Sequence, residues 1–454
     1  MLDDSVTASY LAQFDRPILP LPQTDAERIV FDGSYLSRPM FLRAADRERL
    51  ERDLAAIRSA LGTLPDRVFG GDFRAFARAV GMTEDQIALT VRGDHGSAPR
   101  LTTFARADLY RDGSGFRLLE LNLGSTVGGI DCVDMCRALL GIPDVADFVA
   151  REGLAFGETF EAVLSTLRAE AGVPRAGAGP VMALVETPSD FGDVEDLMRI
   201  RAARWNNRGV PTVVGHLGEL DRAGGRLLLR GEPVDVVYRM FTFEDVLPHA
   251  GDGLLEPLLD AEAAGEVAVF TPLSSEIYGS KGALALLSEP SGRHGLTDAE
   301  RDACVRLLPW TRLVRPGDTE LDDGTVVDLV DHVLEHQHDL ILKPTMSYGG
   351  QGVLLGADPD VTGTVWREAV LDAAGNDAHV VQRLVRPAPE MFPSEVRGGL
   401  EEWTILWGVF MTGDGYAGAI TRGFPAEDRV RAVNRVSGAL CGCTFHEPSA
   451  AHLP

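Results

Sequence analysis

The chain has 454 residues, of which 45% are hydrophobic, and its formal net charge is −25. This length allows two or three domains, and the acidic balance without a basic patch argues against nucleic acid as a partner. No apolar run reaches the roughly eighteen residues of a membrane span, and the N-terminus has no signal-peptide pattern. Five cysteines without a zinc-site or disulfide-framework spacing favour a reduced, cytoplasmic setting.

The first part of the chain is expected to extend over residues 1–175. Residues 1–40 read as loop-rich, whereas the apolar spacing of residues 44–62 and 73–80 predicts two helices. Residues 146–172 are expected to form one or two further helices.

A hairpin with oxygen ligands is predicted between these helices, over residues 104–122. FARADLY alternates as a strand does, RDGSG has the composition of a turn, and FRLLELN reads as a second strand. Glu120 and Asn122 are two residues apart and share one face, which Asp108 can approach across the hairpin. Carboxylate and amide oxygens are ligands that Mg²⁺ prefers, and Arg106 lies beside them. Without other signals, such acids would instead form a solvated face.

A small parallel sheet is predicted next. The small residues AGAGP at 176–180 suggest a domain boundary. VMALVET, a helix-like segment ending in RWNNRG, and VPTVVG then form a strand–helix–strand unit. VDVVYR follows as a strand that ends in Arg239, where ligands of open α/β sheets gather. This second part is expected to cover residues 176–272.

A glycine-rich loop follows a strand that ends in Lys343-Pro344. Glycines let backbone N–H groups approach phosphate oxygens closely, and a lysine adds a point charge. The pattern is neither a Walker A loop nor GxGxxG, and by itself it also fits an ordinary hairpin loop. The candidate phosphate-binding residues of this loop are Ser347, Gly349, Gly350, Gln351 and Gly352.

Residues 379–387, HVVQRLVRP, read as a strand that leads into a linker. Such a linker offers backbone donors and acceptors to an adenine edge, although most segments of this kind are only core strands. The candidate adenine-binding residues are Gln382, Arg383, Leu384 and Val385.

Three histidines precede the strand that ends in Lys343, namely His332, His336 and His338. Their spacing can bind zinc, but without an HExxH signature they are expected on a solvated helix face.

In this order the motifs resemble the circularly permuted form of the ATP-grasp superfamily, in particular the synthetase part of glutathionylspermidine synthase and related ligases. In an ordinary ATP-grasp chain the lysine and glycine loop precede the metal ligands, whereas here Arg106-x-Asp108 and Glu120-x-Asn122 come first. The resemblance covers roughly residues 95–445. Further residues that match the family's motifs are Ser125 and Thr126 after the metal ligands, Lys281 at a helix start, Arg239, and Arg422 at the end of a strand pair.

Two departures from the family limit what the resemblance implies. The chain is too short for the amidase domain that some glutathionylspermidine synthases carry. The loop YGGQGV is also closer to the generic permuted proteins than to these enzymes. The resemblance therefore does not identify glutathione or spermidine as a substrate.

The resemblance implies a mixed α/β (α+β) fold of the permuted ATP-grasp type with a small parallel-sheet pre-ATP-grasp domain. Residues 273–386 would clamp the nucleotide, and residues 387–454 would complete the catalytic core. The cofactors would be ATP and one or two Mg²⁺ ions held by Asp108, Glu120 and Asn122. Lys281 and Lys343 would bind ATP phosphates, and Arg106 and Arg422 would stabilise the transferred phosphoryl group and the tetrahedral intermediate.

The implied activity is that of a carboxylate–amine ligase, which forms an amide or peptide bond through an acyl phosphate and releases ADP. The implied partners are a small carboxylate and an amine, such as an amino acid, a peptide or a polyamine, and a homodimer is left open. Two alternatives remain at this point. One is an ATP-grasp enzyme with a thiol or another acceptor, and the other is a nucleotide-binding regulatory protein without turnover.

Overall fold

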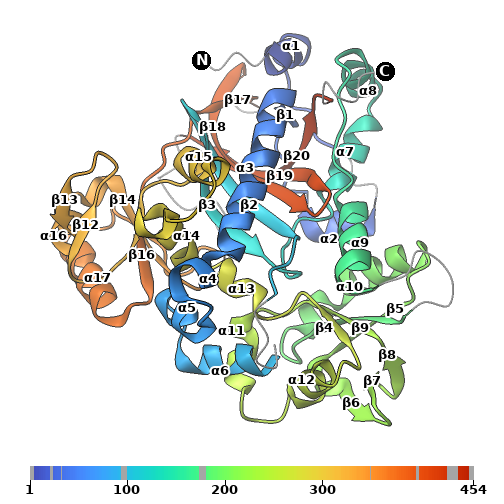
Figure 1. The fold of residues 1–454 in the computed structure, drawn as a ribbon. Helices are drawn as coiled ribbons and strands as arrows, with labels where there is room; N and C mark the ends of the chain where they lie inside the picture. The colour runs from blue at the N-terminus through green and yellow to red at the C-terminus, as the bar shows by residue number, and fades with distance from the viewer. Residues whose placement is uncertain are drawn as a thin grey trace.

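The computed structural model describes residues 5–20, 24–31, 33–93, 100–172, 180–347, 349–394, 398–426 and 438–448. A central sheet carries a lobe of strands and helices on either side, one around β14 and β16 and the other around β4 and β9 (Figure 1). Most of the expected boundary at residues 176–180 lies outside the described residues, and the four expected domain ranges remain a prediction.

The central sheet has seven strands in the order β1-β20-β19-β18-β2-β3, and β17 also pairs with β18. β1 runs parallel to β20, and the other neighbours are antiparallel. The sheet therefore combines strands from the beginning and the end of the chain. Its strands are β1 (Met40–Leu42), β2 (Ala105–Asp112), β3 (Gly115–Leu123), β17 (Glu390–Pro393), β18 (Leu400–Thr412), β19 (Gly415–Pro425) and β20 (Leu440–His446).

The two faces of the central sheet have different roles. Ala105, Ala107 and Leu109 of β2 point into a hydrophobic core, and the alternate residues of the strand point to the opposite face. A buried stripe of α3 (Ala44–Gly62), which includes Leu50 and Leu54, belongs to the same core. The face opposite α3 is therefore the one that carries the polar residues of the hairpin.

The predicted strand–helix–strand unit is present and belongs to a four-stranded parallel sheet in the order β10-β9-β4-β5. A three-stranded antiparallel sheet extends the same lobe. The elements of this lobe are β4 (Met182–Glu186), α10 (Phe191–Asn206), β5 (Thr212–His216), β6 (Leu220–Ala223), β7 (Arg226–Leu229), β8 (Glu232–Val234), β9 (Val236–Arg239), α11 (Phe243–Val246), α12 (Glu256–Ala263) and β10 (Ala268–Phe270).

The other lobe contains a four-stranded sheet in the order β11-β16-β14-β15, whose described pairs are all antiparallel. Its core includes Trp310, Leu342 and Trp366. The elements from α13 onward are α13 (Ser275–Tyr278), α14 (Lys281–Ser288), α15 (Asp298–Leu307), β11 (Thr311–Leu313), β12 (Asp318–Glu320), β13 (Val326–Asp328), α16 (Leu329–Glu335), β14 (Leu340–Pro344), β15 (Leu354–Leu355), α17 (Gly363–Asn376) and β16 (His379–Arg383).

The helices expected at residues 44–62 and 73–80 correspond to α3 and α5. The expectation that residues 1–40 are loop-rich is wrong in part, because two helices lie there and bury Val6, Tyr10 and Phe31. The remaining helices of this part are α1 (Ser5–Gln13), α2 (Asp25–Phe31), α4 (Leu64–Phe69), α5 (Phe73–Ala79), α6 (Glu84–Gly93), α7 (Cys132–Leu140), α8 (Pro143–Arg151) and α9 (Thr159–Glu170), and short 3-10 helices occur at Leu217–Glu219, Leu247–His249, Ser291–Arg293 and Gln337–Asp339.

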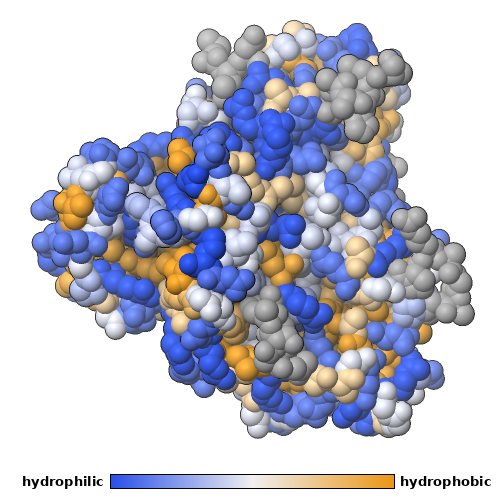
Figure 2. All heavy atoms as spheres, in the orientation of Figure 1, coloured by the Kyte–Doolittle hydropathy of each residue, from blue (hydrophilic) through white to orange (hydrophobic). Residues whose placement is uncertain are grey.

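The surface in Figure 2 is mostly hydrophilic, with apolar residues in short stretches, as expected for a chain with a net charge of −25. Within the described ranges, no helix has both the length and the apolar character needed to cross a bilayer. His332 lies on α16 and His336 directly after it, and their rings stack with centroids 4.2 Å apart on a partly exposed surface.

Candidate active site

The β2–β3 hairpin brings four polar side chains to one face of the central sheet. Arg106 pairs with Asn122, and Asp108 pairs with Glu120. Directly opposed residues of an antiparallel pair point to the same face. After Asp108 the register shifts, because Leu109 pairs with Leu118. The predicted hairpin is therefore present, with the acids and the amide next to one another.

Asp108 lies between two arginines. Its carboxylate accepts hydrogen bonds from Arg106 Nε (2.7 Å) and Nη2 (3.0 Å) and from Arg422 Nη2 (2.9 Å). Burial by itself would raise the pKa of Asp108, but the two guanidinium groups outweigh this effect and lower the pKa to about 2. The carboxylate therefore stays ionised at neutral pH and orients both arginines along the sheet.

Gly408 of β18 makes this arrangement possible. It lies between Asp108 of β2 and Ile420 of β19 in the register. A Cβ atom at this position would lie 3.0 Å from Arg106 Cδ and 3.0 Å from Ile420 Cγ2. The absence of a side chain here leaves the room in which Arg106 lies across the sheet and Arg422 reaches Asp108.

Lys343 reaches the same face from β14. Its ammonium group donates to Gln382 Oε1 (2.7 Å) and to the Leu119 carbonyl (3.4 Å). The side chain is almost fully buried, and this burial, together with the charge of Lys281, lowers the pKa of Lys343 to about 8 although Glu120 acts in the opposite direction. Lys343 is thus a poorly solvated cation that an anionic ligand would stabilise.

Lys281 is the first residue of α14. The Ser280 side chain caps this helix by accepting a hydrogen bond from the Gly282 N–H (3.1 Å). Lys281 Nζ donates to the Ser347 carbonyl (2.9 Å) and lies 3.5 Å from Glu120 Oε2. The side chain therefore connects the predicted glycine-rich loop with the hairpin.

These groups line one cavity of about 490 Å³, a size typical of small-molecule sites. One wall is the central sheet, and the opposite wall is the sheet that contains β14 and β16. One end of the cavity is polar and the other is apolar. Of the residues expected in the site, it is lined by Arg106, Asp108, Glu120, Asn122, Thr126, Lys281, Lys343, Ser347, Gly349, Gly350, Gln382, Leu384, Val385 and Arg422.

Five of the residues expected in the site do not line this cavity. Gln351 is exposed, and Gly352 adopts φ +68° beside Pro344, where a Cβ atom would lie 2.7 Å from Pro344 Cγ. Arg383 points outward and forms an exposed ion pair with Asp322.

Ser125 and Arg239 lie behind the cavity rather than in it. Arg239 is fully buried, forms an ion pair with Glu276 and donates from Nε to the Thr271 carbonyl (2.9 Å). Ser125 Oγ donates to the Arg239 carbonyl (2.7 Å). Arg239 thus forms a buried ion pair and does not line the cavity in which it was expected.

The donor set at the polar end of the cavity fits Mg²⁺. Asp108 and Glu120 supply carboxylate oxygens, and Asn122 supplies an amide oxygen while its Nδ2 faces the Arg106 carbonyl at 3.5 Å. In the described part of the chain, no group of three or more His, Cys, Asp or Glu side chains is placed to hold a metal ion. The remaining ligands of Mg²⁺ would therefore come from phosphate oxygens and water, which this ion accepts readily.

Several cavity residues were not identified from the sequence. Tyr110, Leu406 and Phe424 form part of its apolar floor, and Ile341 and Leu355 lie on the opposite wall. The sequence did contain a pattern that places two of them on the same face as the site residues. Tyr110 follows Arg106 and Asp108 in steps of two along one strand, and Phe424 follows Arg422 in the same way. Thr242 also lines the cavity. It comes from the lobe with the parallel sheet, and no such pattern in the sequence pointed to it.

Comparison with known proteins gives a likeness in fold. No family model matches the sequence, and no curated protein matches it. Among solved structures, the chain is similar to a glutathione synthetase-like effector from Globodera pallida in its apo form, with 13% identity, a TM-score of 0.56, and coverage of 91% of this chain and 90% of the other. A D-cycloserine synthetase is also found, with 17% identity, coverage of 57% and 74%, and a TM-score of 0.32.

The second likeness is too weak to carry an argument, and the first, at its low identity, concerns the fold alone. The chain therefore has a mixed α/β fold similar to that of the glutathione synthetase-like effector.

Proposed function

We propose that this protein is an ATP-dependent carboxylate–amine ligase that forms an amide or peptide bond through an acyl phosphate and releases ADP and phosphate. The observation that carries the proposal is the convergence of two lysines, two arginines, two carboxylates and one amide on a single cavity. These groups come from segments that are more than 300 residues apart in the sequence, from Arg106 to Arg422. The likeness in fold to a glutathione synthetase-like effector supports the same activity.

The apolar end of the cavity suits an adenine ring. Leu119, Leu406 and Phe424 form one side, and Ile341 and Leu355 form the other. An aromatic base buried between such walls gains from the removal of its faces from water. The rim of this end is formed by the end of β16 and the segment that follows it, over which the expected adenine linker extends.

The hydrogen bonds of this linker narrow down which backbone groups meet the base. The Leu384 N–H already donates to the Asp339 carbonyl (2.8 Å). The next residue, Val385, also lines the cavity. We therefore assign adenine recognition to the backbone at Val385 rather than to the whole range from Gln382 to Val385.

The polar end suits the triphosphate. Lys343 and Lys281 would contact phosphate oxygens, and Ser347, Gly349 and Gly350 would lie over them. Asp108, Glu120 and Asn122 would hold one or two Mg²⁺ ions. When bound, Mg²⁺ neutralises charge on the phosphate oxygens and so favours attack at phosphorus.

The proposed reaction has two steps. A carboxylate oxygen of the substrate attacks the γ-phosphorus, so that a C–O–P bond forms, the bond to the β-phosphate oxygen breaks, and ADP leaves. An amine then attacks the acyl carbon, phosphate leaves with the oxygen that came from the carboxylate, and the amine loses a proton. Arg106 and Arg422 would stabilise the charge of the transferred phosphoryl group and of the tetrahedral intermediate.

The proposed partners are a small carboxylate and an amine, such as an amino acid, a peptide or a polyamine. A circularly permuted order of the ATP-grasp segments, with the metal-binding hairpin before the lysine strand, is part of the proposal. It rests on the order in which these residues occur in the chain. A cytoplasmic setting goes with the same proposal.

Two alternatives make different predictions. A thiol or another acceptor would leave the first step unchanged and alter only the second. A regulatory protein that only binds the nucleotide would not need the Asp108 carboxylate held between two arginines. Because these arginines are placed at the polar end, where phosphoryl charge would develop, the enzyme is favoured.

The proposal is tested by substrate-dependent release of ADP. The protein is incubated with ATP, Mg²⁺ and pools of carboxylates and amines, and ADP is measured with and without each pool. Glu120→Gln keeps the shape of the site but removes one carboxylate charge, so it should lower ADP release by about two orders of magnitude or more. ADP release that is unchanged in Glu120→Gln, or that no pool stimulates, would count against the ligase.

A further inference from the structure

The loop between β3 and α7, residues 124–131, forms part of the cavity wall. Thr126, Val127 and Gly128 line the cavity at its polar end. The Gly128 carbonyl accepts a hydrogen bond from Arg106 Nη1 (2.9 Å). Since the other bonds of this guanidinium go to Asp108, the position of the loop decides how Arg106 is held.

The start of this loop is attached to the lobe that contains the parallel sheet. The Ser125 N–H donates to Thr271 Oγ1 (3.0 Å), and the Thr271 N–H donates to Ser125 Oγ (3.0 Å). Ser125 Oγ also donates to the Arg239 carbonyl (2.7 Å) at the end of β9. These bonds fix the first two residues of the loop.

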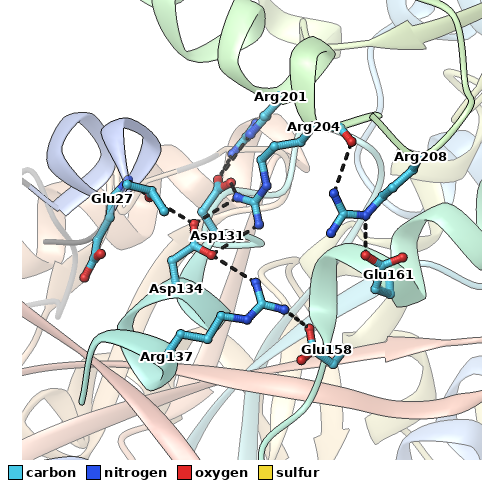
Figure 3. Close-up of polar contacts among 10 residues, drawn as sticks. Glu27, Asp131, Asp134, Arg137, Glu158, Glu161, Arg201, Arg204 and Arg208 are labelled. Carbon is cyan, nitrogen blue, oxygen red and sulfur yellow. Dashed lines mark hydrogen bonds and ion pairs between the residues drawn. The ribbon is translucent and has the colours of Figure 1, made fainter. Parts of the chain in front are cut away.

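The end of the loop is attached to the same lobe by ion pairs. Asp131 accepts from Arg201 Nη2 (2.6 Å) and Nε (3.2 Å) and from Arg204 Nη1 (3.1 Å). Both arginines extend from one helix, α10, toward Asp131 and Asp134 (Figure 3). The Asp131 side chain has no exposed surface and that of Arg201 is 6% exposed, so the pairs are screened little by water.

These contacts carry a functional inference. We infer that Asp131 is a positioning residue: its ion pairs with α10 fix the loop 124–131, so that the Gly128 carbonyl holds Arg106 in place against Asp108. The lobe with the parallel sheet thereby sets the position of the Arg106 guanidinium at the polar end of the cavity. The effect expected on turnover rests on the proposed function, whereas the effect expected on the loop does not.

The chain offers a matched control in Asp53. This buried carboxylate accepts a similar pair of bonds from Arg306, at Nη2 (2.7 Å) and Nε (3.0 Å). The pair joins α3 to α15, and neither Asp53 nor Arg306 lines the cavity. Asp53→Asn therefore removes a two-bond ion pair of a buried carboxylate without touching the loop, although Arg306 is more exposed (45%) than Arg201 (6%).

The test compares Asp131→Asn with Asp53→Asn in the full-length protein. Amide hydrogen exchange of residues 124–131 should be at least about tenfold faster in Asp131→Asn and unchanged in Asp53→Asn. With a substrate that stimulates ADP release, Asp131→Asn should lower kcat at least about tenfold while the Kd for ATP stays within about twofold. If Asp131→Asn does not fold, Arg201→Gln, which removes two of the three bonds to Asp131, gives the same comparison.

Each outcome decides the inference. Loop exchange in Asp131→Asn equal to that of the unaltered protein would overturn it, whether or not any turnover is found. Faster loop exchange with kcat unchanged would show that Asp131 fixes the loop but that the loop does not position Arg106, and this result would overturn the positioning role. Absence of ADP release from the unaltered protein with every pool would count against the proposed function and leave the exchange comparison to decide the anchoring role.

Discussion

Three arginines that were expected in one site belong to two buried arginine–carboxylate groups, and these groups differ in what surrounds them. At the cavity, Arg106 and Arg422 share Asp108, and each arginine side chain is 13% exposed. Behind the loop 124–131, Arg239 pairs with Glu276, and these side chains are 0% and 3% exposed. Both groups lie beside the same loop.

The difference lies in how many of the guanidinium nitrogens already have partners. All three nitrogens of Arg239 donate to protein oxygens, namely those of Thr271, Phe241 and Glu276. Arg422 donates to Asp108, whereas its buried Nε has no hydrogen-bond partner among the described residues. Arg106 is intermediate, because its three nitrogens donate to Asp108 and the Gly128 carbonyl, but its side chain lines the cavity. An arginine with a nitrogen left over next to a cavity, as Arg422 has, can bind a ligand, whereas Arg239 stabilises the fold.

The largest effect is expected from Arg239→Gln. The change leaves Glu276 as a buried carboxylate without its cation, which typically costs about 3–5 kcal/mol. Urea unfolding should show this loss, and the folded fraction should bind ATP normally. Arg222→Gln, which breaks an exposed pair with Glu266 in the same lobe, should leave the free energy of unfolding nearly unchanged. A stable Arg239→Gln variant that has lost substrate-dependent turnover would instead place Arg239 in the substrate site.

Arg422→Gln should lower turnover with little loss of stability, which is the reverse of the effect expected for Arg239→Gln. Loss of a donor that stabilises charge in the transition state typically lowers kcat by about 10²- to 10³-fold. The free energy of unfolding should change little, because Arg106 still pairs with Asp108 through two bonds. Arg422→Lys keeps the charge and should recover part of the activity. A normal kcat in Arg422→Gln would remove the distinction between the two groups.

Lys343 gives a pH-dependent test on the cavity side. Its pKa of about 8 means that the free protein loses this charge as the pH rises through 8, so ATP affinity should fall from pH 7 to pH 9. The free energy of unfolding should instead rise with pH above about pH 8. Between this pH and the ordinary lysine pKa, the unfolded chain binds the proton and the folded chain does not. Calorimetry and urea unfolding of the unaltered protein and Lys343→Met should show both trends only when the lysine is present.

The smallest effect is expected from Gly408→Ala. The added methyl group would press on Arg106 Cδ and Ile420 Cγ2, each 3.0 Å away, and should lower kcat by about tenfold through displacement of Arg106. Gly442→Ala is the matched control, because its methyl group would meet Leu36 Cδ1 at 2.8 Å and Thr421 Oγ1 at 3.0 Å on the face opposite Arg422. Equal losses of kcat in the two variants would contradict a specific role for Gly408.

Periodicity explains what could be predicted from the sequence. A step of two residues places Glu120 and Asn122 on one face, and the turn after Asp112 sets the register as far as Leu109. The shift beyond Leu109, which pairs Asp108 with Glu120 rather than with Leu119, had no signal in the sequence. The strand–helix–strand unit after residue 180 followed from the same kind of pattern. The helices at residues 5–13 and 25–31 were missed because they are short and lie beside a proline-rich stretch.

The surroundings of the site residues could not be predicted in this way. The sequence placed Arg239 at a strand end, but its saturation by Thr271, Phe241 and Glu276 depends on contacts made by residues up to 37 positions away. The anchoring of Asp131 by Arg201 and Arg204 joins residues about 70 positions apart. Long-range packing, rather than local pattern, therefore decides which arginines face the cavity.

The proposed function requires that the cavity activates a carboxylate at the γ-phosphate of ATP. The most direct measurement uses a substrate carboxylate labelled with ¹⁸O, with analysis of the nucleotide and phosphate products by mass spectrometry. We expect ADP as the nucleotide product and one ¹⁸O atom in each inorganic phosphate released. AMP and pyrophosphate with the label in AMP, or ADP with unlabelled phosphate, would contradict an acyl phosphate formed in this site.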